Sequence, residues 1–160
     1  PPLAPIEIAE IRADANGAEP AQEYVELWNR SDAALDLTGC RLSDRADSAG
    51  DVLPSPSFLP AHGRALVVAD AFDPTDPADP TVAPGVPLFR IGTSIATAGL
   101  ANTGEPLFLR DASGRRITEA PAVAAPGPGR CIARLAGRSR LPEPGEYGPA
   151  ADGSCSPGLP

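Results

Sequence analysis

The sequence contains no methionine and no lysine, and it has one histidine, one tryptophan and three cysteines. Any Ser-His or Cys-His catalytic group would therefore have to use His62. This residue lies in the segment LPAHGRA, without a Gly-x-Ser-x-Gly nucleophile turn, so a solvent-exposed turn histidine is the better interpretation. No apolar run approaches the roughly 18 residues of a membrane span, which argues against direct membrane insertion.

Helical patterns are also nearly absent, because Pro or Gly interrupts the windows with apolar residues at helical spacing. The 21 prolines and 16 glycines instead separate short clusters of Val, Ile, Leu and Phe. Because no helices intervene between these clusters, the sequence predicts an all-β fold, an antiparallel β-sandwich with long Pro- and Gly-rich loops. The predicted strands are 6–11, 24–28, 35–42, 57–59, 64–70, 87–92, 106–111, 115–118 and 130–135.

Chain length and the missing methionine set the expected domain boundaries. A chain of 160 residues is most simply one domain. Because position 1 is not Met, we expect a trimmed N-terminus, with residues 1–4 as a linker before a domain over 5–160. Three Pro- and Gly-rich stretches predict irregular excursions from the sheets, at 70–87, 120–129 and 139–160.

The segment EYVELWN holds the only tryptophan and two carboxylates, Glu23 and Glu26. A strand places these glutamates on opposite faces and about 10 Å apart along its axis. They therefore cannot act together as an acid and a base, although Glu26 could still pair with Glu10 on a neighbouring strand. The preferred interpretation makes Glu26 an acceptor for loop backbone amides, while Val25 and Leu27 pack between two sheets.

Four aspartates recur at three-residue spacing in the Pro-rich stretch 70–87. Such a cluster suggests a calcium site, because Ca²⁺ binds several oxygen ligands at once. However, prolines stiffen the spacing and no EF-hand or Gly-Asp repeat surrounds it, so a solvated acidic loop is the preferred interpretation. The weak calcium candidates are Asp73, Asp76 and Asp79, which follow Asp70.

The three cysteines lack the paired spacing and the histidine partners of a zinc site. Cys40 lies in an apolar strand and is expected to pack as a small hydrophobic residue. Cys131 and Cys155 flank the C-terminal stretch, where a disulfide closing about 25 residues would stabilise the fold by roughly 3 to 4 kcal/mol. A Cys40–Cys155 bridge and a fully reduced protein remain open as alternatives.

Charge is distributed unevenly along the chain. Residues 1–109 contain six arginines and sixteen acidic residues, whereas residues 110–160 contain seven arginines and five acidic residues. The net charge of -8 disfavours nucleic acid, but a local arginine patch could bind phosphate, acidic polysaccharide or an acidic protein surface. Pairing with acidic residues of the same chain is the simpler alternative. The candidate binding residues are Arg110, Arg115, Arg116, Arg130, Arg134, Arg138 and Arg140.

Several segments, taken in order, resemble a lamin tail domain, of the kind found in bacterial extracytoplasmic proteins and in nuclear lamins. They are IEIAEIRAD, EYVELWN, ALDLTGCRLSD, FLPAHGRALVVAD, LANTGEPLFLRDASGRRI and a closing SPG. The resemblance implies an immunoglobulin-like β-sandwich with no cofactor and no catalytic residues. Cys40 stands where this family usually has an aromatic residue, which is consistent with a buried position. Ligand sites vary between members, so the resemblance provides no binding residue.

These observations predict a non-enzymatic interaction or attachment module of a secreted, periplasmic or cell-surface protein. The expected partner is another protein, or further copies of the same assembly, at the cell surface. One alternative is an accessory domain that binds nucleic acid or acidic polysaccharide through the C-terminal arginines. A remote alternative is a hydrolase built on Glu10, Glu26 and His62.

Overall fold

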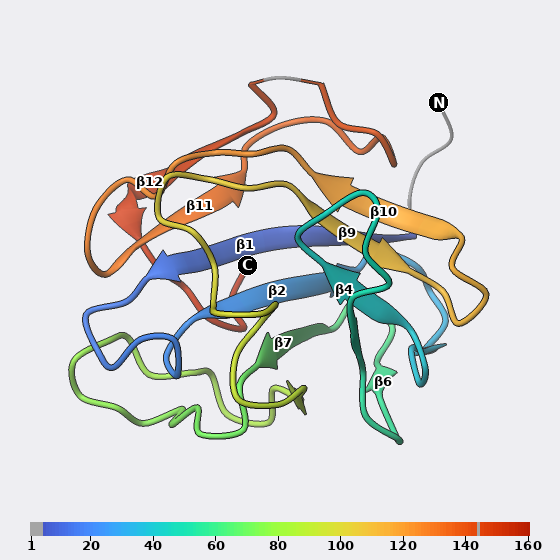
Figure 1. Cartoon of the computed structure of the whole chain (residues 1–160), viewed down its shortest axis with the longest axis horizontal. Coiled ribbons are helices and arrows are strands. Elements are labelled where there is room, and N and C mark those ends of the chain that lie inside the picture. The colour runs from blue at the N-terminus through green and yellow to red at the C-terminus, as the bar shows by residue number, and fades with distance from the viewer. Residues whose placement is uncertain (1–4, 144) are drawn as a thin grey trace.

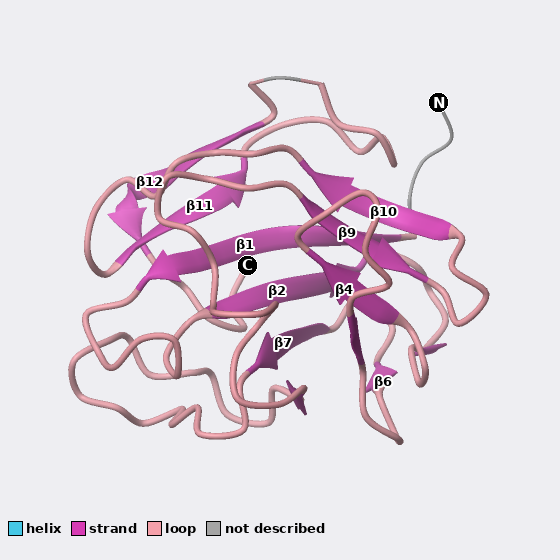
Figure 2. Ribbon diagram, in the orientation of Figure 1, coloured by secondary structure: helices cyan, strands magenta, loops and turns pink. Residues whose placement is uncertain are grey.

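A computed structural model describes residues 5–143 and 145–160, so the linker expected at 1–4 lies outside the described residues. Figure 2 shows strands and loops, and no helix, in this described part of the chain. None of its elements is a helix long and apolar enough to cross a membrane. The strands are β1 (Ile6–Asp14), β2 (Tyr24–Asn29), β3 (Leu35–Asp36), β4 (Arg41–Ser43), β5 (Asp51–Val52), β6 (Phe58–Leu59), β7 (Arg64–Val68), β8 (Leu88–Arg90), β9 (Leu107–Arg110), β10 (Arg116–Ala120), β11 (Arg130–Arg134) and β12 (Tyr147–Ser154).

Two sheets overlie one another in the view of Figure 1. The larger sheet has six strands in the order β12-β11-β1-β2-β7-β8, and the smaller has four in the order β10-β9-β4-β5. Strands β3 and β6 form a separate two-stranded pair. This arrangement confirms the predicted all-β, immunoglobulin-like sandwich.

The main hydrophobic core lies between the two sheets. Strand β2 is central, because it pairs with β1 on one side and with β7 on the other. Val25 and Leu27 are fully buried in this core, as their alternation predicts. Tyr24 points to the opposite, outer face, where a second apolar cluster forms. The larger sheet is therefore covered on both faces over part of its area.

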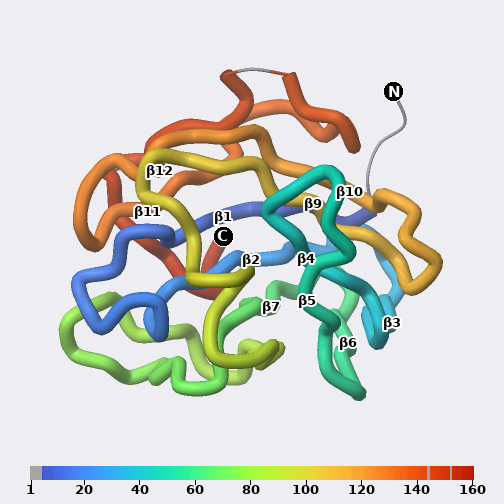
Figure 3. The backbone as a smooth tube through the Cα atoms, viewed as in Figure 1, coloured from blue at the N-terminus to red at the C-terminus, as the bar shows by residue number. Residues whose placement is uncertain are grey.

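The second cluster is built from segments that lie far apart in the sequence. Phe72 and Val82 come from the long loop between β7 and β8, which Figure 3 shows as a wide excursion. Ala150 and Cys155 come from the C-terminal region. The outer face of the six-stranded sheet thus acquires its cover from the Pro-rich loop and from the end of the chain.

The disulfide joins Cys131 on β11 to Cys155, just after β12. Both cysteines belong to the second apolar cluster, whereas Cys40 is a free, buried thiol in the main core. The expected Cys131–Cys155 pairing is confirmed, and the alternative Cys40–Cys155 bridge is wrong. The bridge fastens the C-terminal segment to the larger sheet.

Three local expectations need correction. Residues 147–154 form β12, within the stretch 139–160 for which the sequence predicts an irregular chain throughout. The sequence YGPAADGS has little strand propensity, but β12 is an edge strand where Pro149 is tolerated. Strands β7 and β8 pair in parallel, because the long loop between them allows a crossover. The strand predicted over 35–42 is interrupted by a turn at Thr38-Gly39, which separates β3 from β4.

Candidate functional site

The two glutamates of EYVELWN hold different segments of the chain. Glu23 accepts a hydrogen bond from the backbone N–H of Leu100, 2.7 Å away, in the LANTGE loop. Glu26 accepts one from the backbone N–H of Gly158, 2.6 Å away, in the closing SPG. Their separation confirms that they do not form an acid–base pair, and that Glu26 serves as an acceptor for a loop amide.

Gly158 fits closely against the Pro-rich loop. Its φ is +81°, and a Cβ atom added there would lie 2.3 Å from the side chain of Val86. A residue other than glycine would therefore be strained and would displace the segment from Glu26. The closing SPG is a docking sequence for the outer face of the sheet.

Glu10 and Glu26 face each other across β1 and β2, both nearly fully buried. Glu10 accepts hydrogen bonds from the hydroxyl of Tyr24 and from both the backbone N–H and the hydroxyl of Ser156. Burial is the main cause that raises the pKa of Glu26 to about 7. Both carboxylates are thus engaged with the segment 156–158 that covers them.

His62 lies away from these carboxylates. It occupies an exposed turn, and its Nε2 contacts Asp32 at 2.7 Å. The turn position agrees with the sequence-based interpretation. The structure does not bring Glu10, Glu26 and His62 together, so it provides no assembled group for the remote hydrolase alternative.

Beside the docked segment lies a groove of about 480 Å³, which we call the outer-face groove. Trp28 forms part of its wall and contacts two arginines. The guanidinium carbon of Arg30 lies 4.2 Å from the Trp28 ring, and that of Arg64 lies 4.3 Å from it. Arg30 follows Trp28 by two residues, just after β2 ends, and Arg64 is the partner of Trp28 on β7. The strand register therefore assembles this stack.

Carboxylates orient the arginines of the groove. Arg30 binds both oxygens of Glu7, at 2.7 and 3.0 Å, and Arg134 donates to the same carboxylate at 3.3 Å. Arg64 donates to Glu26 at 2.7 Å. These partly buried pairs hold the guanidinium groups in place more firmly than exposed ion pairs would.

Alternation with the core residue Leu27 places Trp28 on the outer face, but the sequence alone does not identify Arg30, Arg64 or Glu7 as its neighbours. Strand alternation could have found Arg30, because residues i and i+2 share a face. Glu7 stands between two buried core positions of β1, so the same rule places it outward. The contact with Arg64 depends on the pairing of β2 with β7, and no short-range pattern specifies that register.

The predicted arginine set does not form one surface. Arg110, Arg115 and Arg116 lie on or next to the β9–β10 hairpin of the smaller sheet, whereas Arg130 and Arg134 lie on β11 of the larger sheet. Arg134 is nearly fully buried and also donates to the carbonyl of Ser139. The exposed loop after β11 carries Arg138 and Arg140.

Like Arg134, two other members of the set donate to backbone carbonyls of loops or strands. Arg110 donates to the hydroxyl of Ser43 and to the carbonyls of Ala46 and Ser48, which fixes the loop after β4. Arg140 donates to the carbonyl of Ile117, which brings its loop against β10. Arg110 therefore acts within the fold, while Arg140 lies near the arginines of the hairpin.

The three calcium candidates serve different local roles. Asp79 is buried and accepts hydrogen bonds from the backbone N–H groups of Asn16 and Gly17. Asp73 and Asp76 accept hydrogen bonds from backbone groups two residues later in their own turns. Among the described residues, no group of three or more His, Cys, Asp or Glu side chains is placed to hold a metal ion.

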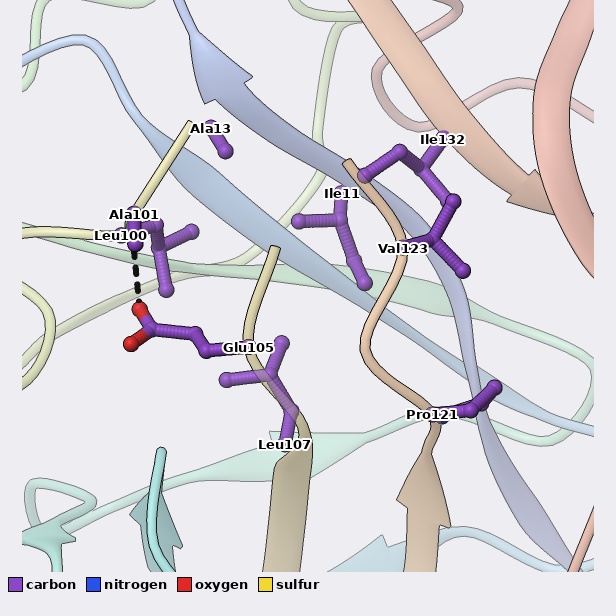
Figure 4. Close-up of a pocket in the computed structure, with 9 residues that line it drawn as sticks. All are labelled: Ile11, Ala13, Leu100, Ala101, Glu105, Leu107, Pro121, Val123 and Ile132. Carbon is purple, nitrogen blue, oxygen red and sulfur yellow. Dashed lines mark hydrogen bonds between the residues drawn. The ribbon is translucent and has the colours of Figure 1, made fainter. Parts of the chain in front are cut away.

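A second, smaller cavity lies at one end of the main core (Figure 4). Its volume is about 10 Å³, and its wall is mostly apolar, with Ile11, Leu107 and Val123 among the lining residues. The carboxylate of Glu105 accepts a hydrogen bond from the backbone N–H of Ala101, as the dashed line in Figure 4 shows. This volume is about that of one water molecule, so the cavity is too small for an organic ligand.

The chain matches a protein-family model over more than half of its length. The family model described as Lamin Tail Domain matches residues 1–123. No curated protein matches the chain. The matched region includes β1, β2 and β7, which carry the Trp28 stack, but it ends before the SPG segment that docks beside it.

Proposed function

The chain belongs to the lamin tail domain family, and from this premise we propose that it is an extracytoplasmic attachment module that binds a protein partner. The family supports a non-enzymatic, immunoglobulin-like interaction domain. The proposed setting is a secreted or surface protein, or an assembly at the cell surface. The Cys131–Cys155 disulfide supports this setting, because such bonds persist mainly in oxidising compartments.

The observation that carries the proposal is the structural role of Glu10 and Glu26, the paired carboxylates on the outer face. Glu10 and Glu26 would be the natural residues for acid–base chemistry, yet each holds the closing segment through its backbone N–H groups. The groove beside them is lined by Trp28 and arginines, which are residue types that dominate the energetics of protein interfaces. This composition favours binding over turnover.

Photo-crosslinking in the native host tests the function. A photoreactive residue replaces Leu135, which is exposed at the groove, and in a second variant it replaces Phe58, which is exposed on β6. We expect a discrete protein adduct from position 135 and none from position 58. In unreduced protein from the host, Cys131 and Cys155 should also resist alkylation, because they form a disulfide. A purified domain that hydrolyses a substrate, with a folded but inactive Glu26→Gln variant, would contradict the proposal.

A second proposal is binding of nucleic acid or acidic polysaccharide near β10. The contact between Arg140 and the carbonyl of Ile117 supports it, because this contact places Arg140 near Arg115 and Arg116. Binding to DNA or heparin should then weaken steeply with salt and fall in an Arg115→Gln/Arg140→Gln double variant. Absent or salt-insensitive binding would contradict this alternative.

A further inference from the structure

The Trp28 stack holds two guanidinium groups in fixed orientations. Arg30 and Arg64 both lie over the indole ring, and each is also paired with a carboxylate of a neighbouring strand. Their side chains are 21% and 13% exposed, so the groups are shielded without being sealed from solvent. A guanidinium that is stacked and paired in this way loses little further freedom when it binds a ligand.

Trp28 and the two arginines over it keep hydrogen-bond donors without an acceptor among the described residues, whereas the buried glutamates of the groove are already engaged. Every carboxylate oxygen of Glu7, Glu10 and Glu26 already accepts at least one hydrogen bond. Within the described part of the chain, by contrast, no acceptor bonds the indole N–H of Trp28, Nη1 of Arg30, or Nε and Nη2 of Arg64. The complementary ligand must therefore supply acceptors, and a carboxylate matches guanidinium N–H groups best.

Apolar side chains lie at the same groove. Leu135 and Leu159 line it and are 56% and 51% exposed, among the most exposed large apolar residues of the described chain. Pro160 and the methyl groups of Ala133 and Ala151 also line it. The ligand should therefore combine an acceptor group with aliphatic surface, since burial of such surface drives association.

We propose that the outer-face groove binds an extended peptide segment of a protein partner, with an Asp or Glu carboxylate against Arg30 and Arg64 and an adjacent aliphatic side chain against Leu135 and Leu159. This inference rests on the proposed function and deepens it. A sugar is a poorer match, because the guanidinium groups already lie over the aromatic ring on which a sugar would stack. The volume of about 480 Å³ accommodates a short segment.

Trp28 is the only tryptophan of the chain, so its fluorescence reports directly on the groove. The purified, oxidised protein is titrated with the peptide Ac-Leu-Glu-Leu-Glu-Leu-NH2 and with its counterpart in which Gln replaces Glu. We expect a saturable change in Trp28 emission, with affinity at least about tenfold higher for the acidic peptide. Equal affinity for the two peptides, or no change at millimolar acidic peptide, would overturn the inference.

Substitutions then locate the carboxylate. Arg30→Gln and Arg64→Gln should each reduce the preference for the acidic peptide by about tenfold. The matched control is Arg41→Gln, because Arg41 is a half-buried strand arginine on the smaller sheet, and it should leave affinity unchanged. Circular dichroism shows which variants are folded. If Arg64→Gln unfolds, the carboxylate assignment is tested by Arg30→Gln and by comparison of the Glu and Gln peptides. An unchanged preference in folded Arg30→Gln protein would overturn the assignment.

The same titration separates this inference from competing partners. Heparin and polygalacturonate oligomers are added as acidic polysaccharides, and saturable binding of these to the groove without binding of the acidic peptide would overturn the proposal in favour of a glycan. A protein adduct from position 135 without acidic-peptide binding would refute the carboxylate inference but leave the interaction function standing. Binding of the acidic peptide without any adduct in the host would instead count against the function proposed above.

Discussion

The outer faces of the two sheets carry the same side-chain arrangement with different consequences. On the larger sheet, Trp28 contacts Arg30 and Arg64. On the smaller sheet, Phe108 contacts Arg110, two residues later on β9, and Arg116 from the adjacent β10. In both cases an aromatic residue lies beneath two guanidinium groups, one supplied two residues later in the chain and one by a neighbouring strand.

The difference lies in what supplies the remaining acceptors. On the smaller sheet, the hydroxyl of Ser43 at the end of β4 and two carbonyls of the following loop accept hydrogen bonds from Arg110, and Phe108 is buried. On the larger sheet, the closing segment binds Glu10 and Glu26, and the groove beside Trp28 stays open. The same arrangement therefore stabilises a loop on one face and leaves donors available to a ligand on the other.

Removal of the disulfide should have the largest effect, because it releases the cover of the larger sheet. In Cys155→Ser we expect the free energy of unfolding to fall by about 3 kcal/mol, since the bridge restricts a loop of about 25 residues in the unfolded chain. Trp28 emission should shift to the red as the segment 156–160 loosens. Urea denaturation measures the loss, and Cys40→Ala, with an expected loss of about 1 kcal/mol, is the control. Equal stability of Cys155→Ser and the parent would contradict this account.

Arg110→Gln tests the cover of the smaller sheet. It removes donors from the carbonyls of Ala46 and Ser48, so we expect a loss of about 2 kcal/mol in unfolding free energy. Limited proteolysis should also cut the loop 44–50 faster. The control is Arg115→Gln, which alters a pair whose arginine is 79% exposed and should stay within about 0.5 kcal/mol of the parent. A similar loss in both variants would mean that Arg110 does not hold the loop.

The sequence was sufficient for features that depend on local patterns. Short apolar clusters bounded by turn residues predict β1, β2, β7 and β9, and alternation places Val25 and Leu27 in the core. The turn at 111–114 follows from Asp-Ala-Ser-Gly, with Gly114 at a φ of +88°. Features that depend on pairing between strands are harder to predict. Strand β12 has a sequence with little strand propensity, and the contact of Arg64 with Trp28 depends on the register of β2 and β7. The candidate site is built mainly from such long-range contacts. The sequence alone therefore predicts only the outward position of Trp28 and the acceptor role of Glu26.

The free energy of unfolding should depend on pH through Glu26, which lies on the larger sheet. The pKa of Glu26 is raised to about 7, chiefly by burial, so the folded state favours the protonated carboxyl. Its contribution to stability is present below the ordinary pKa of about 4.5 and is lost as pH rises through about 7. Between these values we expect the unfolding free energy of the parent to fall by about 1 to 2 kcal/mol more than that of Glu26→Gln. A tenfold difference in proton affinity between the folded and unfolded states corresponds to about 1.4 kcal/mol, and water in the groove screens part of the effect. Parallel pH profiles would contradict the assignment.

Among the variants of the larger sheet, Arg30→Gln is expected to have the smallest effect on stability. Arg30 is partly exposed, and Glu7 keeps Arg134 as a partner when Arg30 is lost, so the unfolding free energy should fall by no more than about 1 kcal/mol. Trp28 emission should nevertheless change, because one of the two groups over its ring is removed. Urea denaturation and fluorescence measure the two quantities in one sample. If Arg30→Gln were as destabilising as Arg110→Gln, the arginines of both outer faces would serve to stabilise the fold. That result would argue against the groove as the binding face.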